Sequence, residues 1–306
     1  MDTVHPGGAV VVGVDGSDSA RRAVRWAAAE AALRHAPLRL VSVFTALPPG
    51  RFGDPSRSGS YRRHLVETGQ AALDAAAGVA GEVAPGVEVQ PELREGFPGP
   101  VLLAASRDAV LTVVGSRGLG GFIGLLAGSI AVALAARGGS PVVVVRGDEV
   151  APEAGGAETP DQRPVLVGVD GSPASEAAIG LAFDEAALRG APLQALHSWL
   201  DHGLVPALAA GIDWATLETE EHVLLAQRLA GWSQKYPDVD VRRVVERDRP
   251  AHALVTASAA AQLVVVGSRG RGGGAGLFLG SVSHALLHHS RCPVMVARPP
   301  EEDDDR

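Results

Sequence analysis

The sequence contains its own repeat, and this repeat limits the chain to a tandem of two similar units. VGVDGS at Val12–Ser17 returns at Val167–Ser172, 155 residues later, and EAALRHAPL returns as EAALRGAPL at the same distance. VVGSRG at Val113–Gly118 returns at Val265–Gly270, now 152 residues later. The repeated unit has roughly 140 residues, the size of an ordinary domain, so the repeat predicts two complete domains of one fold.

Changes in composition give the domain boundaries. We predict a first domain at 1–147, a linker at 148–163, a second domain at 164–298 and a tail at 299–306. The linker region is rich in proline, glycine and acidic residues and has no apolar periodicity, which is typical of a connecting segment. The tail EEDDDR is a run of charge that we expect to be solvated.

Strand and helix patterns alternate within each unit. AVVVGV is a continuous run of mostly β-branched residues, as expected for a strand that is buried on both faces. Ser17 or Ser19 can cap the helix that follows, in which small apolar residues recur at helical spacing. Five strands alternating with four helices predict an α/β fold, with a doubly wound parallel sheet in each of the two tandem domains.

Composition excludes several classes of function. The chain has 27 basic and 35 acidic residues, a net charge of −8, which argues against nucleic acid as a partner. The single cysteine, Cys292, forbids an intramolecular disulfide and fits a reducing compartment. We expect no secretory signal at the start of the sequence. We therefore expect a cytoplasmic protein. Lys235 is the only lysine, which excludes mechanisms that need a lysine beside a glycine-rich loop or in a Schiff base.

One segment raises the question of a membrane. Eighteen consecutive uncharged residues run from Leu119 to Ala136, the lower limit for a helix that spans a bilayer. Four glycines interrupt this run, and its counterpart in the second unit contains three histidines. A glycine-rich loop that leads into a buried helix explains both versions, so we expect no membrane partner.

The same glycine spacing follows the fourth strand of each unit. It reads Gly115-x2-Gly118-x9-Gly128-Ser129 in the first unit and Gly267-x2-Gly270-x9-Gly280-Ser281 in the second. Glycine allows backbone N–H groups to face a ligand, and a helix that begins at Gly-Ser presents free N–H groups to a phosphate. The serine hydroxyl can cap the helix or donate to a phosphate oxygen. A plain strand-to-helix turn explains one such loop, but two copies at identical spacing favour phosphate binding.

The paired GVDGS opening, the GxxGx9GS loop and the closing strand SPVVVVR or CPVMVAR together resemble the universal stress protein family, in its tandem, ATP-binding form. The resemblance covers about residues 8–146 and 164–298. It implies the strand order 3-2-1-4-5 of the adenine nucleotide alpha hydrolase-like fold. Ligands of such sheets bind where the strand order reverses, beyond the carboxyl ends of strands one and four.

The resemblance also implies roles for individual residues. The acids that end the first strand would lie beside the adenosine, the backbone that ends the second strand would contact adenine, and the glycine loops with their serines would hold phosphates with Mg²⁺. The residues implied to bind ATP are Asp15, Val43, Gly115, Gly118, Gly128 and Ser129 in the first unit, and Asp170, Ser198, Gly267, Gly270, Gly280 and Ser281 in the second. Each aspartate can equally serve as a helix N-cap or form an Asx-turn, and neither role excludes the other. Ala131 stands where the second unit has Ser283, so we expect the first site to lack a hydroxyl contact.

The remaining polar residues suggest little further chemistry. His284 and His288 have the i, i+4 spacing of a zinc site, but a histidine-rich helix end is the favoured interpretation, so no metal site is predicted. No acid and base are paired for attack on a phosphate, so we expect a nucleotide-binding regulator of the stress response rather than an enzyme. The alternatives are a slow ATPase or self-phosphorylating enzyme and a nucleotide-free interaction scaffold. The resemblance further implies a homodimer and a regulatory protein partner.

Overall fold

The chain forms two compact units, Met1–Gly156 and Ala157–Arg306. Our computed structural model describes residues 8–46, 55–118, 127–146, 162–199, 213–271 and 279–298, with side chains in the second helix described from residue 59 onward. Residues 148–161 of the predicted linker and the whole of the predicted tail lie outside these ranges. Each unit is described by itself.

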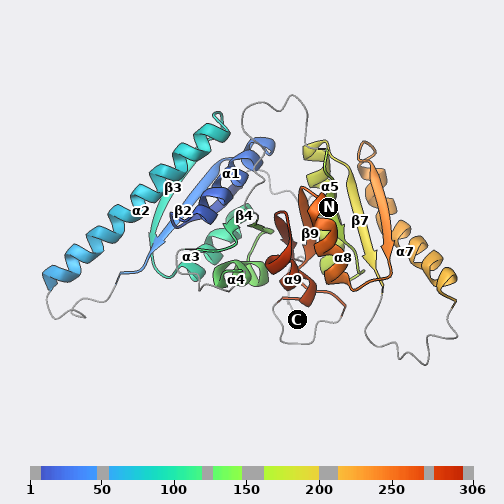
Figure 1. Cartoon of the computed structure of the whole chain (residues 1–306). Helices are drawn as coiled ribbons and strands as arrows, with labels where there is room; N and C mark the ends of the chain where they lie inside the picture. Colours follow the sequence, from blue (N-terminus) through green and yellow to red (C-terminus); the bar gives the residue numbers. More distant parts are fainter. Residues whose placement is uncertain are drawn as a thin grey trace, which may run out of the picture. The chain divides into compact units, whose positions relative to one another are not determined.

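The first unit alternates strands and helices, as the sequence pattern predicts (Figure 1). Its elements are β1 (Ala9–Val14), α1 (Asp18–Leu33), β2 (Leu38–Phe44), α2 (Pro55–Val83), β3 (Val89–Glu95), α3 (Pro98–Ala105), the 3₁₀ turn η1 (Ser106–Asp108), β4 (Ala109–Gly115), α4 (Ser129–Arg137) and β5 (Val142–Val145).

The second unit repeats this order in its described residues. Its elements are β6 (Val165–Gly168), α5 (Pro173–Arg189), β7 (Leu193–Ser198), α7 (Trp214–Lys235), β8 (Val241–Glu246), α8 (Pro250–Ala257), the 3₁₀ turn η2 (Ser258–Ala260), β9 (Leu263–Gly267), α9 (Ser281–His289) and β10 (Val294–Ala297).

Each unit contains a parallel sheet whose order confirms the predicted topology. The first sheet runs β3-β2-β1-β4-β5 and the second runs β8-β7-β6-β9-β10. Strands β1 and β4 are neighbours, with Val12 opposite Val113, and β6 lies beside β9 with Val167 opposite Val265. The strand order reverses here, because β2 lies on the other side of β1 from β4, and β7 lies on the other side of β6 from β9. The carboxyl ends of β1 and β4, and of β6 and β9, therefore form the positions where such sheets bind ligands.

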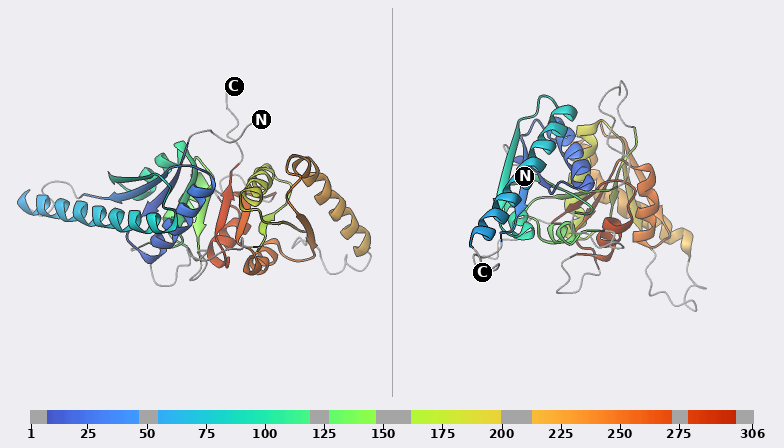
Figure 2. Two further views of the ribbon diagram at one scale, coloured as in Figure 1. Left: turned by 90° about the horizontal axis from the view of Figure 1, so that it is seen from above. Right: turned by 60° about the vertical axis from the view of Figure 1, so that its left-hand side comes forward.

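Helices cover both faces of each sheet (Figures 1 and 2). In the first unit α1 packs beside α2, and α3 packs beside α4. Gly13 of β1 faces Leu102 of α3, whereas Gly115 of β4 faces Ser19 of α1, so the two helix pairs lie on opposite faces. This double covering explains why Val10, Val11 and Val12 are fully buried.

Small side chains allow α1 to lie close to the sheet. Ser17 is its N-cap, and the serine oxygen accepts a hydrogen bond from the Ala20 amide at 3.1 Å. The face toward the sheet is built of alanine, with Ala23, Ala27 and Ala31 fully buried. A helix with such a face carries little bulk, so its first turn can come close to the end of β4.

Cys292 is buried in the second unit beside β10, at 1% exposure. Burial raises the pKa of its thiol to about 11, and the hydrogen bond with Ser290 opposes this only in part. Because the thiolate is the reactive form, only roughly one molecule in a thousand is reactive at about pH 8. We expect an aromatic disulfide reagent to label the native protein very slowly and the urea-unfolded protein at once. Rapid stoichiometric labelling under native conditions would contradict this burial.

In the described parts of the chain, no helix is both long enough and apolar enough to cross a membrane. The uncharged run Leu119–Ala136 had raised the question of a membrane, and its residues 119–126 lie outside the described ranges. Its later part forms α4, a helix of 9 residues, in which Leu134 and Ala135 are buried.

Candidate functional site

A hollow of about 570 Å³ opens in the first unit beyond the carboxyl ends of β1, β2 and β4. It is bounded by Val41 and Val43 of β2, by Leu102 of α3 and by the first turn of α4. All six residues of the predicted first site line this hollow: Asp15, Val43, Gly115, Gly118, Gly128 and Ser129. The hollow also has the size of a small-ligand site, within the usual range of about 300–1,000 Å³.

The carboxylate of Asp15 lies directly beside the glycine loop. Its Oδ1 atom accepts a hydrogen bond from the Ser17 amide at 2.9 Å, which is the Asx-turn that the sequence allows. A Cβ atom on Gly118 would come within 2.6 Å of Asp15 Oδ2. The N-cap of α1 is Ser17 rather than Asp15. The second carboxylate oxygen thus faces the loop, and glycine at 118 leaves room for it.

Gly115 lines the hollow and also allows β4 to pack against α1. A Cβ atom there would lie 2.7 Å from the backbone carbon and oxygen of Ser19, inside the contact between β4 and α1. The Ser19 hydroxyl also accepts a hydrogen bond from the Arg117 amide at 3.2 Å. Glycine is therefore required at position 115, because the backbones of β4 and α1 are in contact there. The same contact places the glycine loop beside the first turn of α1.

The helix that follows each glycine loop begins at a glycine and has no side-chain cap. Gly128 and Gly280 are the N-caps of α4 and α9, and neither helix start has a side-chain capping bond. Each cap glycine is anchored instead by its own amide, which donates to the carbonyl of Ser116 or Ser268 at 2.7 Å. Ser129 and Ser281 are the first helical residues, so their hydroxyls do not cap the helices. In the first unit this helix start lines the hollow, which is where an anion site would lie.

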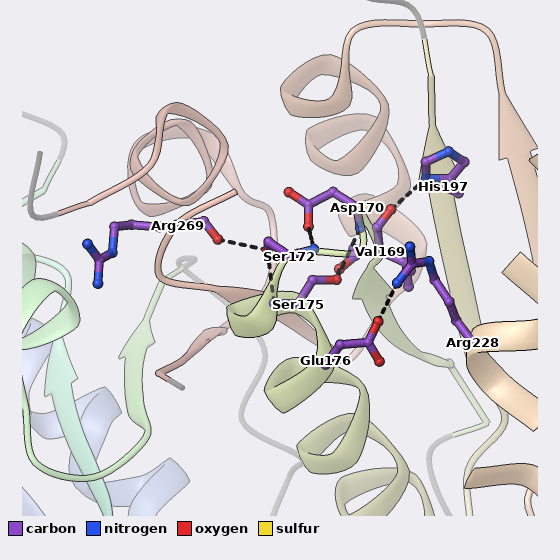
Figure 3. A network of polar contacts seen from close by, with 9 residues as sticks. Val169, Asp170, Ser172, Ser175, Glu176, His197, Arg228 and Arg269 are labelled. Carbon is purple, nitrogen blue, oxygen red and sulfur yellow. Dashed lines mark hydrogen bonds and ion pairs between the residues drawn. The ribbon is translucent and has the colours of Figure 1, made fainter. Parts of the chain in front are cut away.

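The second unit repeats this arrangement (Figure 3). Asp170 Oδ1 accepts from the Ser172 amide at 2.9 Å, and its Oδ2 accepts from the Arg271 amide at 3.2 Å. A Cβ atom on Gly270 would touch Asp170 Oδ2, as Gly118 would touch Asp15. Ser172 Oγ donates to the Arg269 carbonyl at 3.3 Å. The turn after β6 and the glycine loop after β9 are therefore joined through Asp170 and Ser172.

Two expectations about hydroxyl groups need correction or refinement. Ser283 does not face a ligand: it is 2% exposed, and its hydroxyl donates to the carbonyl of Gly267 at 2.6 Å. Ala131 in the first unit therefore removes an internal hydrogen bond rather than a ligand contact. Ser198 ends β7 as predicted, and its hydroxyl donates to the carbonyl of Asp248. Only its backbone is left for a ligand, which is the role that the resemblance implies.

Sequence reasoning missed an arginine at the first site. Arg117 lies between the two glycines of the loop and lines the hollow. Arg146, just after β5, lies close enough that burial and, second, the charge of Arg117 lower the pKa of its guanidinium. The sequence contained a signal for this arginine, since the triplet Ser-Arg-Gly recurs in both units, but only the glycine of the triplet was predicted to bind the ligand. Two cations near the carboxyl ends of β4 and β5 favour an anionic ligand.

The histidines of α9 line a separate shallow hollow with Gly280 and Ser281. The rings of His284 and His288 have their centroids 4.5 Å apart. Among the described residues, no group of three or more histidine, cysteine or acidic side chains is placed to hold a metal ion.

Comparisons with known proteins agree with this geometry. A sequence model described as the Universal stress protein family matches residues 8–146 and 162–298. The chain belongs to the universal stress protein family. A universal stress protein of Mycobacterium tuberculosis is 44% identical over 298 residues, which cover 94% of this chain and 96% of that protein. One from Mycolicibacterium smegmatis is 43% identical over 297 residues, covering 95% and 97% of the two chains.

A solved universal stress protein shares the fold over almost the whole chain. The crystal structure from Archaeoglobus fulgidus superposes with a TM-score of 0.69 at 20% identity, covering 96% of this chain and 100% of that one. Such a low identity shows the fold alone. The family match and the mycobacterial relatives therefore establish this protein as a tandem universal stress protein, and the ligand must be argued from the site itself.

Proposed function

We propose that each unit binds one molecule of ATP and that the protein is a nucleotide-dependent regulator of the stress response. The observation that carries this proposal is the hollow at the switch point of the first sheet. It brings an aspartate, a glycine loop and a free helix N-terminus around one space. The second unit has the same aspartate against the same glycine position. We also propose that this regulator works in the cytoplasm as a homodimer with a protein partner.

The donor set of the first site fits the parts of a nucleotide. Val41, Val43 and Leu102 supply an apolar wall for a base, and the first turn of α4 supplies N–H groups for phosphates. Mg²⁺ would bring charge neutralisation for the phosphates. Asp15 is one carboxylate, already bonded to the Ser17 amide, and an all-protein cage needs several such oxygens. The ion would accordingly be held chiefly by phosphate oxygens, as Mg²⁺ usually is.

An enzymatic role is the less favoured function. Hydrolysis of ATP needs a base or an orienting group beside the attacking water. Asp15 and Asp170 are the acids at these sites, and both use carboxylate oxygens to hold backbone amides. Such carboxylates act as structural acceptors, which suits binding without turnover.

The proposal is tested by identifying what the purified protein carries. We expect denaturation of the freshly purified chain to release an adenine nucleotide, detected by liquid chromatography and mass spectrometry. Absence of any adenine nucleotide, together with no binding of added ATP in the presence of Mg²⁺, would favour the interaction scaffold. Sustained phosphate release that is lost when Asp15 and Asp170 are replaced would favour the enzyme.

Arg117→Ala is expected to weaken ATP binding at the first site and to leave adenosine binding nearly unchanged. Loss of one charged hydrogen bond to phosphate lowers affinity by about tenfold. Isothermal titration of a chain whose second site is blocked by Gly270→Val measures this difference. The exposed Arg63→Ala on α2 serves as the matched control. Equal losses for ATP and adenosine would show that Arg117 supports the fold rather than the phosphates.

A further inference from the structure

The two units end in strands that occupy the same position but differ in sequence. Among the described residues, β3 is the outermost strand of the first unit and β8 is the outermost strand of the second. Leu40 of β2 lies opposite Pro91 of β3. Ala195 of β7, which is 155 residues after Leu40, lies opposite Arg243 of β8. Because 155 is the spacing of the repeat in this part of the chain, Pro91 and Arg243 are equivalent positions.

Every second residue of β8 turns its backbone groups away from the rest of the sheet. The carbonyl of Asp240, directly before β8, accepts a hydrogen bond from the Leu193 amide of β7 at 2.8 Å. The N–H and C=O groups of one strand residue point to the same side, and the side alternates along the strand. The even-numbered residues of β8 therefore face β7. The odd-numbered residues, among them Arg243 and Val245, turn their N–H and C=O groups outward.

A proline closes the corresponding edge of the first unit. The Leu38 amide donates to the carbonyl of Glu88 at 2.8 Å, so the odd-numbered residues of β3 face outward. Pro91 is one of them, and it has no N–H group to offer to a further strand. Proline is tolerated here because its missing N–H points away from β2. Arg243 has an N–H group at the same place, so the outer edge of β8 keeps the donor that β3 lacks.

The charges of β8 favour one way of adding a second β8. Two identical strands related by a two-fold axis across the edge run antiparallel. With Val244 on the axis, Arg242 lies opposite Glu246 of the second copy, and Arg243 lies opposite Val245. With the axis moved to Arg243, two arginines lie opposite each other. Opposite charges in facing positions stabilise a strand pair and like charges destabilise it, so the register centred on Val244 is favoured.

The same register matches the backbone groups. Arg243 and Val245 both face outward, so in an antiparallel pair they exchange two N–H···O bonds, and the two-fold axis repeats this exchange. Val244 faces its own sheet and meets Val244 of the second copy in the closer, non-hydrogen-bonded spacing. Both the charges and the backbone groups of β8 are therefore complementary to a second copy of β8.

We propose that the outer edge of β8 is the surface through which two copies of this chain pair, antiparallel about an axis at Val244. This proposal rests on the homodimer of the proposed function and names its surface. It does not depend on ATP, because β8 contributes no residue to the predicted nucleotide sites. The edge of β3 takes no part, since Pro91 closes it.

Arg243→Pro tests the edge by copying the first unit. The change removes an outward N–H group and leaves the hydrogen bonds between β8 and β7 in place. Sedimentation equilibrium at several protein concentrations measures the dissociation constant of the dimer. We expect the variant to raise this constant about tenfold or more, since two N–H donors are lost from each dimer. Arg243→Ala keeps the N–H group and is the matched control, with a constant close to that of the wild type.

Charge reversal tests the register and does not require a proline in the strand. Glu246→Arg sets arginine opposite Arg242, and Arg242→Glu sets glutamate opposite Glu246, so each should weaken the dimer about fivefold. The double variant restores opposite charges and should recover the wild-type constant. The ion pair of Arg242 with Asp240 is exposed, so its loss has little effect on the fold. Additive weakening in the double variant overturns the proposal.

Hydrogen exchange of single amides reads the interface in the unchanged chain. The amides of Arg243 and Val245 should exchange slowly when the chain is dimeric and fast after dilution below the dissociation constant. The outward amide of Leu93 on β3 is the control and should exchange fast at both concentrations. Protection of Arg243 that does not change on dilution means that another part of the same chain covers the edge, which overturns the proposal.

The remaining outcomes separate this surface from the proposed function. A dimer that is unchanged by Arg243→Pro and has an unprotected Arg243 amide overturns the β8 interface and leaves the homodimer standing. A wild-type chain that stays monomeric at about 0.1 mM overturns both the interface and the homodimer. A β8 dimer that binds no ATP supports the interface and overturns the nucleotide part of the proposed function alone.

Discussion

Replacing Gly118 and Gly270 together by valine is expected to abolish ATP binding while the fold stays intact. A Cβ atom at either position meets the tip of an aspartate side chain, Asp15 or Asp170, and not backbone. The carboxylate can move aside, so the sheet keeps its structure, but the phosphate loop and the aspartate lose their arrangement. Isothermal titration with ATP and Mg²⁺ gives the binding, and circular dichroism gives the fold.

The single variants provide the internal controls. Gly118→Val alone or Gly270→Val alone should leave about one ATP per chain, since each helix N-terminus serves its own phosphates. Gly86→Val, where a new Cβ meets nothing within 4 Å, should leave both sites intact. Gly115→Val should instead unfold the first unit, because its Cβ meets the backbone of Ser19. Full binding by the double variant would show that the ligand does not use the glycine loops.

Phe183→Ala is expected to lower the free energy of unfolding of the second unit by about 3–5 kcal/mol. Phe183 on α5 is fully buried, and its ring stacks with Trp232 at 6.2 Å and Tyr236 at 5.6 Å between centroids. Removal of the ring leaves a cavity between α5 and the end of α7. Urea unfolding followed by tryptophan fluorescence reports this unit well, because three of the four tryptophans belong to it.

Phe97→Ala is the matched control, since Phe97 is 69% exposed and its loss leaves no cavity. We expect its effect to be within about 0.5 kcal/mol. A loss below about 1 kcal/mol for Phe183→Ala would mean that α7 does not depend on this aromatic cluster for its place against α5.

The fold was predictable because the same pattern of strands and helices occurs twice in the sequence. The alternation of apolar runs such as AVVVGV with alanine-rich helices needs only local reading, and the repeat removes the ambiguity of any single motif. The family resemblance supplied the strand order, which the pairing of β1 with β2 and β4 confirms. The positions of Asp15 and Gly118 beside each other follow from that order.

Contacts between distant segments could not be predicted. Gly180 of α5 is required because a Cβ there would lie 2.6 Å from the Trp232 ring, yet in the sequence it is only a glycine inside a helix pattern. Ser283 reads as a ligand hydroxyl but turns inward to the Gly267 carbonyl. The contact of His197 with Glu221 joins a strand to a helix residue 24 positions later, and no local sequence pattern predicts this contact. Each depends on tertiary distance, which spacing along the chain does not encode.

Titration of the wild-type chain with ATP and Mg²⁺ by isothermal calorimetry tests the central claim most directly. Nucleotide carried through purification is first removed and its removal checked by absorbance. The account predicts saturation at about two ATP per chain, one for each helix N-terminus that follows a glycine loop. Absence of any binding heat, with a folded chain by circular dichroism, would contradict the claim that these two sites bind ATP.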